Sequence, residues 1–195
     1  MNKKVERGQD TRLRMVSVAT TLFGELGYES TSVEAVLRDS GVSRGALYHH
    51  FASKESLFEA VLEAVEAELA AATLKASRGI ADPVEAMHVG FDTFLALAQT
   101  TRLRQIVLMD APAVLGWQKW REIEARHGFG LLKAALLAMA EGGRVRKDLV
   151  DVFAHVLLAA LIEVALMIAR ADDPANALRS GRMALRQLTD KLFAP

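Results

Sequence analysis

The stretch of sequence that decides the fold is TSVEAVLRDSGVSRGALYHHFASK, residues 31–54, which predicts two short helices joined by a tight turn. Either Ser32 or Thr31 can cap the first helix, because a hydroxyl oxygen accepts a hydrogen bond from an unpaired backbone amide. Gly41 can adopt the left-handed backbone that often ends a helix, and Ser43 is placed to cap the second helix. Two helices joined by so short a glycine-containing turn are typical of a helix-turn-helix.

The polar face of the second helix carries hydrogen-bond donors, one guanidinium and aromatic rings, but no carboxylate. That mixture suits a helix in the major groove of DNA, where polar groups reach base edges or phosphates. An ordinary helical hairpin with a solvated polar face is the alternative interpretation. We interpret Arg44 as the reader of a guanine and Gly45 as a point of close backbone approach. Tyr48 and Lys54 are interpreted as phosphate contacts. The full set of expected DNA-binding residues is Thr31, Ser32, Ser43, Arg44, Gly45, Tyr48, His49, His50 and Lys54.

Residues from about 11 to 58 resemble the DNA-binding domain of the TetR (tetracycline repressor) family of bacterial transcription regulators, over roughly the first third of the chain. The matching residues are Ala19, Leu22, Phe23, Leu26, Gly27, Tyr28, Thr31-Ser32-Val33, Gly41-Val42-Ser43, Leu47-Tyr48-His49-His50-Phe51, Lys54-Glu55 and Leu57-Phe58. The resemblance implies an all-helical, dimeric DNA-binding protein whose second domain senses a small molecule. Ala52 departs from the family's pattern, in which a charged or polar residue is common there, and this removes one possible phosphate contact.

Apolar residues recur at intervals of three and four along the rest of the chain, which predicts helices and no strand. The expected fold class is all-α, with an N-terminal three-helix DNA-binding domain containing the helix-turn-helix, then a larger helical ligand-binding and dimerisation domain. About nine helices are expected in all; those outside the quoted stretch span about 11–26, 54–76, 83–99, 102–109, 115–140, 149–170 and a last one after Asp173-Pro174. Gly128 and Gly130 lower helix propensity, so a kink or bulge is expected there.

The chain divides into two expected domains. Residues 1–54 form a basic arm plus the helix-turn-helix domain, and residues 55–195 form the effector-binding and dimerisation domain. The helix at about 54–76 connects them and could transmit a shift as a rigid lever. Formal net charge is zero, but residues 1–54 hold eight Lys/Arg against six Asp/Glu. The arm is basic through Lys3, Lys4, Arg7, Arg12 and Arg14. It either follows DNA phosphates or enters the minor groove, or it is a solubilising tail.

Composition narrows the class of protein. The chain has 195 residues and no cysteine, which excludes a disulfide framework and a thiolate zinc site. Its start is polar and lacks the apolar run of a signal peptide, so a cytoplasmic location is expected. The most apolar segment, residues 149–169, contains Asp151, His155 and Glu163, and charges at mid-span are costly in a bilayer. A buried or dimer-forming helix is therefore predicted there, with no membrane partner.

The last two helices are the expected dimer interface, because the first is apolar around most of its circumference and the second carries an apolar seam. The expected interface residues are Leu157, Leu161, Leu178, Gly181, Leu185, Leu188 and Leu192. Completion of the monomer core by both helices is the alternative.

An apolar cavity with a few polar anchors is the general form of a small-molecule site. The candidates for such a pocket are His88, Phe91, Phe94, Arg102, Met109, Trp117, Trp120, His127, His155 and Met167. Each aromatic residue could equally be core. The histidines lack the close spacing of a metal motif, so no metal and no cofactor are expected.

Enzymatic function is not supported, because the sequence has no Gly-x-Ser-x-Gly elbow, no His-Glu-x-x-His and no cysteine. The sequence and the resemblance together predict a regulator, by family prevalence a repressor. Its expected partners are double-stranded palindromic operator DNA, a second copy of the chain, and an unidentified, largely apolar small-molecule effector that releases the DNA. The alternative is a DNA-binding regulator whose C-terminal domain only dimerises or senses a protein partner.

Overall fold

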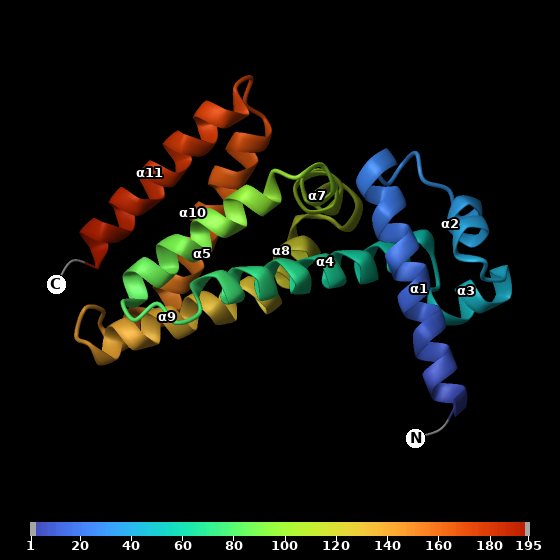
Figure 1. Cartoon of the computed structure of the whole chain (residues 1–195), viewed down its shortest axis with the longest axis horizontal. Helices are drawn as coiled ribbons and strands as arrows, with labels where there is room; N and C mark the ends of the chain where they lie inside the picture. Colours follow the sequence, from blue (N-terminus) through green and yellow to red (C-terminus); the bar gives the residue numbers. More distant parts are fainter. Residues whose placement is uncertain (1–2, 194–195) are drawn as a thin grey trace. The chain divides into compact units, whose positions relative to one another are not determined.

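The computed structural model describes the backbone of residues 3–193 and the side chains of residues 8–193. Every regular element in this part of the chain is a helix, as predicted, and no strand occurs in it (Figure 1). The chain forms two compact units. The first contains Met1–Val65 and Thr101–Trp120, and the second contains Glu66–Thr100 and Arg121–Pro195. The predicted division at residue 54 concerns function and stays a prediction. The division by packing is different, because residues 101–120 group with the N-terminal unit.

The first unit begins with α1, Lys3–Leu26, which starts eight residues earlier than predicted. The backbone expected to be an arm is therefore helical from residue 3, whereas the side chains of Lys3, Lys4 and Arg7 lie outside the described residues. α1 packs on α2, Val33–Ser40, and on α3, Arg44–His50.

The predicted helix-turn-helix is confirmed by its caps. Ser32 is the N-cap of α2 and accepts a hydrogen bond of 3.1 Å from the Ala35 amide. Gly41 ends α2 with a φ of 65°, in the left-handed region. Ser43 then caps α3 and accepts from the Ala46 amide at 3.3 Å. These three local signals fix where the turn begins and ends.

An aromatic cluster forms part of the core of the first unit. The ring centroids of Phe23 and Phe58 lie 5.3 Å apart, and the ring of Tyr28 lies 5.1 Å from that of Phe58. Phe58 belongs to α4, Lys54–Ser77, whose first half lies in this unit and whose second half lies in the other.

Residues 101–120 approach α1 closely at Gly24, and one hydrogen bond links them to Tyr28, just after α1. A Cβ at Gly24 would lie 2.6 Å from Cγ of Arg102, so only glycine allows this contact. The Tyr28 amide donates to Asp110 at 2.8 Å, and the side chain of Gln105 donates to the same carboxylate at 2.9 Å.

The predicted end of the helix at about residue 109 is wrong. α6, Thr101–Leu103, continues as a π-helical segment, Arg104–Asp110, and then as α7, Ala111–Leu115. Pro112 lies in the first turn of α7, where its missing N–H and fixed φ fit the helix. α8, Trp117–Glu124, follows Gly116.

The second unit contains the rest of α4 together with α5, Pro83–Ala98, α9, Gly130–Glu141, α10, Val150–Ala169, and α11, Pro174–Leu192. A short 3₁₀ turn, Lys147–Leu149, precedes α10. Asp82 and Asp173 cap α5 and α11 immediately before a proline. The predicted irregularity near Gly128 is a π-helical segment, Ala125–Phe129 (η2), between α8 and α9.

α10 is the helix with the apolar segment. By length and composition alone, Lys147–Ala169 could cross a membrane, with a mean hydropathy of 2.4. However, α10 packs against α5, α9 and α11 of the same chain, while Asp151 and Glu163 are exposed. α10 is therefore a core helix of the second unit.

α11 packs against α10 through Gly181. A Cβ at Gly181 would lie 2.6 Å from Cγ1 of Val164, so the glycine does allow a close approach, but to α10 of its own chain. Leu157, Leu161 and Leu185 are likewise buried inside the protomer. These four expected interface residues thus complete the monomer core, which was the alternative, whereas Leu188 and Leu192 are exposed.

Candidate nucleic-acid interface and ligand cavity

The recognition helix α3 presents its polar residues to solvent. Ser43, Arg44, Gly45 and His49 are exposed, and 47% of the surface of Tyr48 is accessible. Nothing lies within 4 Å of the position that a Cβ of Gly45 would occupy, so this part of the helix is open. His50 is half-buried and packs edge-on against the ring of His49.

Arg44 has an ion-pair partner that the sequence interpretation missed. Its guanidinium donates a hydrogen bond to the carboxylate of Glu34 on α2, and both side chains are more than half exposed. A hydrogen bond from its own backbone amide, and then the Arg44 guanidinium, lower the pKa of the Glu34 carboxyl group. Glu34 lies ten residues before Arg44, so only the turn between the two helices brings them together.

Thr31 and Lys54, two of the predicted DNA-binding residues, are not fully exposed. The Thr31 side chain is buried and donates to the carbonyl of Gly27 at 2.8 Å, which places it in the packing of the unit and not on a DNA-facing surface. Nζ of Lys54 lies 4.0 Å from the ring centroid of Tyr28, a cation–π contact. Lys54 is only half-buried, so its role as a phosphate contact stays a prediction.

The second unit contains a cavity of about 220 Å³. Phe91 and Phe94, both on α5, are the two predicted pocket residues that line it. Most of the wall is apolar, and it is formed by α4, α5, α9, α10 and the segment around Gly128. The lining residues are Glu66, Leu69, Ala70, Thr73, Leu74, Ser77, Ala86, Met87, Gly90, Phe91, Phe94, Glu124, Gly128, Leu131, Leu132, Ala134, Ala135, Leu158 and Leu161.

The other eight predicted pocket residues lie outside this lining. Arg102, Met109, Trp117 and Trp120 all belong to the first unit. Trp120 is buried there with its ring centroid 5.0 Å from that of the exposed Trp117. In the second unit, His127 is half-buried, while His155 and Met167 are exposed on their helices.

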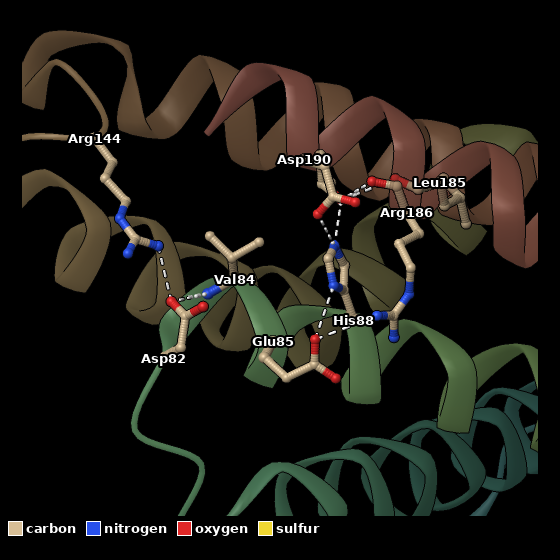
Figure 2. Close-up of polar contacts among 9 residues, drawn as sticks. Asp82, Val84, Glu85, His88, Arg144, Leu185, Arg186 and Asp190 are labelled. Atoms are coloured by element: carbon tan, nitrogen blue, oxygen red, sulfur yellow. Dashed lines mark hydrogen bonds and ion pairs between the residues drawn. The ribbon is translucent and has the colours of Figure 1, made fainter. Parts of the chain in front are cut away.

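His88 is buried between α5 and α11 and not in the cavity (Figure 2). Its Nε2 lies 2.7 Å from the hydroxyl of Thr189 and 3.3 Å from the carboxylate of Asp190. Its Nδ1 lies 3.3 Å from Glu85, and this hydrogen bond, with the nearby Arg186 guanidinium, lowers the pKa of the Glu85 carboxyl group. His88 therefore joins two helices as a satisfied core histidine.

Two buried glutamates in the cavity wall were not predicted. Glu66 on α4 is 3% exposed and Glu124 on α8 is 2% exposed. Oε2 of Glu124 accepts a hydrogen bond of 2.7 Å from Arg121, whereas Oε1 is buried without a hydrogen-bond partner among the described residues. Burial raises the pKa of the Glu124 carboxyl group to about 7, and Arg121 opposes this rise.

A sequence signal for Glu124 did exist. The charged residues around it are typical of a solvated helix face, but Glu124 follows Trp120 by four residues. Trp120 is fully buried, and residues four apart share a face of a helix, so the periodicity places Glu124 on the buried side. Among the residues with described side chains, no group of three His, Cys, Asp or Glu is arranged to hold a metal ion.

Comparison with known proteins fits this architecture. Residues 84–192, more than half of the chain, match the family model described as "Tetracyclin repressor-like, C-terminal domain", and residues 16–61 match "Bacterial regulatory proteins, tetR family". The chain belongs to the TetR family. It is a DNA-binding transcriptional regulator and not an enzyme, as predicted.

Relatives of this TetR-family regulator are similar over different lengths. The HTH-type transcriptional regulator UidR of Escherichia coli K12 is 34% identical over 88 residues, which are 45% of this chain and 41% of UidR. A crystal structure of a TetR-family transcriptional regulator from Pectobacterium atrosepticum has a TM-score of 0.85 and 28% identity, covering 100% of this chain and 99% of that one. The structure of RolR with resorcinol has a TM-score of 0.76 at 17% identity, covering 97% and 96%, and shows the shared fold.

Arg44→Ala tests base reading by this TetR-family regulator. Because arginine to guanine is the commonest specific contact, the change should cost about 1–3 kcal/mol and relax the preference at one base pair per half-site. Selection of bound sequences from random DNA measures the preference. Arg38→Ala is the control, since Arg38 is another exposed, ion-paired arginine but lies on α2. An unchanged selected motif for Arg44→Ala would contradict its reading role.

Glu124→Gln tests the burial of a titrating carboxyl group. The folded-state pKa of about 7 lies above the ordinary 4.5, so the protonated carboxyl group is favoured in the folded wild type. Its contribution to stability is fully present below pH 4.5 and is lost as pH rises to 7. The glutamine variant has no such loss and should be more stable at pH 8 by as much as about 3 kcal/mol. Urea unfolding at pH 4.5 and pH 8 measures the difference, and equal pH dependence in both proteins would contradict the assignment.

Proposed function

We propose that this regulator is a repressor that binds a palindromic operator as a homodimer and is released by a small-molecule effector. The observation that carries the proposal is the continuity of α4. This helix begins at Lys54, shortly after recognition helix α3 ends at His50, and its later residues Glu66, Leu69 and Thr73 line the cavity. One continuous helix thus connects the segment after the proposed DNA-reading helix with the proposed ligand site.

The mechanism requires two states with different spacings of the two recognition helices. An effector shifts the population away from the operator only if it binds the released state more tightly. A ligand in the cavity touches α4 directly, so any difference in its contacts between the states acts on the helix that follows α3. Occupancy of the operator would block a promoter, which is the basis for proposing repression, and cytoplasmic location follows from access to the DNA.

The proposed dimer surface is the outer face of α10 and α11. Large apolar side chains are exposed on both helices, namely Val152, Val156 and Met167 on α10 and Met183, Leu188 and Leu192 on α11. Exposed large apolar side chains on two helices that pack against each other favour an interaction site there. A two-fold axis would place the same patch of each copy against the other and form a four-helix bundle. This set replaces the buried Leu157, Leu161, Gly181 and Leu185 as the proposed contacts.

Met183→Glu with Leu188→Glu tests the dimer. Each side chain would bury part of its surface twice by symmetry, so the pair should remove roughly 3–6 kcal/mol of association free energy. Sedimentation should show monomers, and operator affinity should fall although α3 is unchanged. Leu137→Glu with Ala138→Glu is the control, because both residues are exposed on α9. A double mutant on α11 that sediments as a full-strength dimer would contradict this surface.

Ala135→Leu tests the cavity as the effector site. The added atoms occupy the cavity, so the variant should bind DNA normally but lose its response to small molecules. Fluorescence anisotropy of the complex with DNA selected from random duplexes would be measured against a panel of phenyl-bearing amines, alcohols and carboxylates. Ala138→Leu adds the same atoms to the exposed side of α9 and should respond like the wild type.

Two outcomes would contradict an effector in this cavity. The first is an Ala135→Leu variant that is released as readily as the wild type. The second is a wild-type complex that no member of the panel dissociates, which favours a second domain that only dimerises or senses a protein partner.

A further inference from the structure

The polar side chains around the cavity share one chemical property. Only Glu66, Thr73, Ser77 and Glu124 are polar among the described residues that line it, and none of them is Lys, Arg, His, Asn or Gln. All four therefore present oxygen atoms that can accept hydrogen bonds. The wall offers two carboxyl groups and no cation, so it disfavours anionic ligands.

The two hydroxyl groups use their protons within α4. Thr73 donates to the carbonyl of Leu69 at 2.9 Å, and Ser77 donates to the carbonyl of Thr73 at 3.2 Å. Each hydroxyl has a single proton, so both keep only acceptor capacity toward the cavity. Neither can act as a donor to a ligand without breaking its bond to the helix.

Glu124 restricts the chemistry of the ligand most strongly, because one of its buried carboxylate oxygens has no hydrogen-bond donor among the described residues. Its side chain is nine-tenths or more buried, and Oε2 is already paired with Arg121 at 2.7 Å. Oε1 lacks a partner among the described residues, and a buried oxygen of this kind is uncommon in native proteins. Gly128 lies one turn later, and the position that its Cβ would occupy is 3.9 Å from Oε1, so a side chain there would pack against this oxygen.

We propose that the cavity binds a small protonated amine with an apolar body, whose ammonium group donates a hydrogen bond to Oε1 of Glu124. The proposal rests on the proposed function of this cavity as the effector site. Phe91, Met87 and Leu158 supply the apolar contacts for the body of the ligand. The volume of about 220 Å³ is below the range of about 300–1,000 Å³ typical of drug-sized sites, which indicates a ligand of one ring or a short chain.

The experiment compares three ligands of one shape on the full chain by isothermal titration calorimetry. Phenethylamine is a cation, 2-phenylethanol is a neutral donor and phenylacetate is an anion. We expect the amine to bind at least about 10-fold more tightly than the alcohol, because hydrogen bonds between charged groups are the stronger kind. Phenylacetate should show no binding. Tighter binding of the alcohol or the carboxylate would overturn the proposal.

Glu124→Gln tests whether the preference for the amine depends on the carboxylate of Glu124. The amide is isosteric but neutral, so affinity for phenethylamine should fall about 10-fold or more, while affinity for 2-phenylethanol changes less than about 3-fold. Glu122→Gln removes the same charge from an exposed position on α8 and should leave both affinities unchanged. Unchanged amine binding by Glu124→Gln would overturn the assignment.

The pH dependence gives a second readout that a purely structural role would not produce. The pKa of Glu124 is raised to about 7, so a bound ammonium displaces a proton below that pH. Amine affinity should rise about 10-fold from pH 6 to pH 8 in the wild type and stay flat in Glu124→Gln. Arg121 on α8 pairs with Glu124, and Glu66 on α4 is the other charged residue of the described cavity lining, whereas the lining residues of α5, α9 and α10 carry no charge. A flat profile in the wild type would overturn the ion pair.

A DNA-release measurement separates this inference from the proposed function. Glu124-dependent amine binding that leaves the DNA complex intact would support the ligand class and overturn effector release. Release of DNA by 2-phenylethanol or phenylacetate, without preferential amine binding, would support effector release and overturn the ligand class. Release by phenethylamine alone, lost in Glu124→Gln, would support both.

Discussion

The structure depends on one continuous helix whose buried side chains belong to two cores. α4 has 24 residues and is therefore about 36 Å long. Its first half contributes Leu57, Phe58 and Leu62 to the unit that contains the helix-turn-helix, and its second half contributes Leu69 to the other unit. Side chains of one helix thus belong to both cores. A ligand in the cavity would contact the second half of α4, the helix that begins shortly after α3.

The buried polar groups of the second unit differ in how well they are satisfied. His88 has contacts to Thr189, Glu85 and Asp190. Glu124 instead keeps a buried oxygen without a partner and a pKa raised by burial. Local violations of this kind reduce stability and tend to occur at functional sites. The same carboxyl group thus underlies both the predicted loss of stability between pH 4.5 and 7 and the proposed preference of the cavity for a donor.

The sequence predicted those features that depend on local chemistry. The serine caps, Gly41 and the two Asp-Pro starts each act within a few residues, and the structure has all of them. Features that depend on packing were harder to predict. α10 is apolar on nearly every side, so periodicity could not distinguish buried Leu157 from exposed Val156. The π-helical segment at Arg104–Asp110 likewise has no local signal, and the Arg44–Glu34 pair exists only because the turn brings two helices together.

The energy of one charge-assisted hydrogen bond is sufficient for the proposed switch. Coupling between an effector and a distant site is typically about 1–3 kcal/mol, and a hydrogen bond to a charged group contributes about 1.5–3 kcal/mol. If the ammonium–Glu124 bond forms in the released state and not in the DNA-bound state, it alone shifts operator affinity by roughly 10- to 150-fold. The apolar wall contributes affinity in both states and so adds little to the difference. In this arrangement the apolar surface provides binding, and the buried carboxyl group provides the discrimination between states.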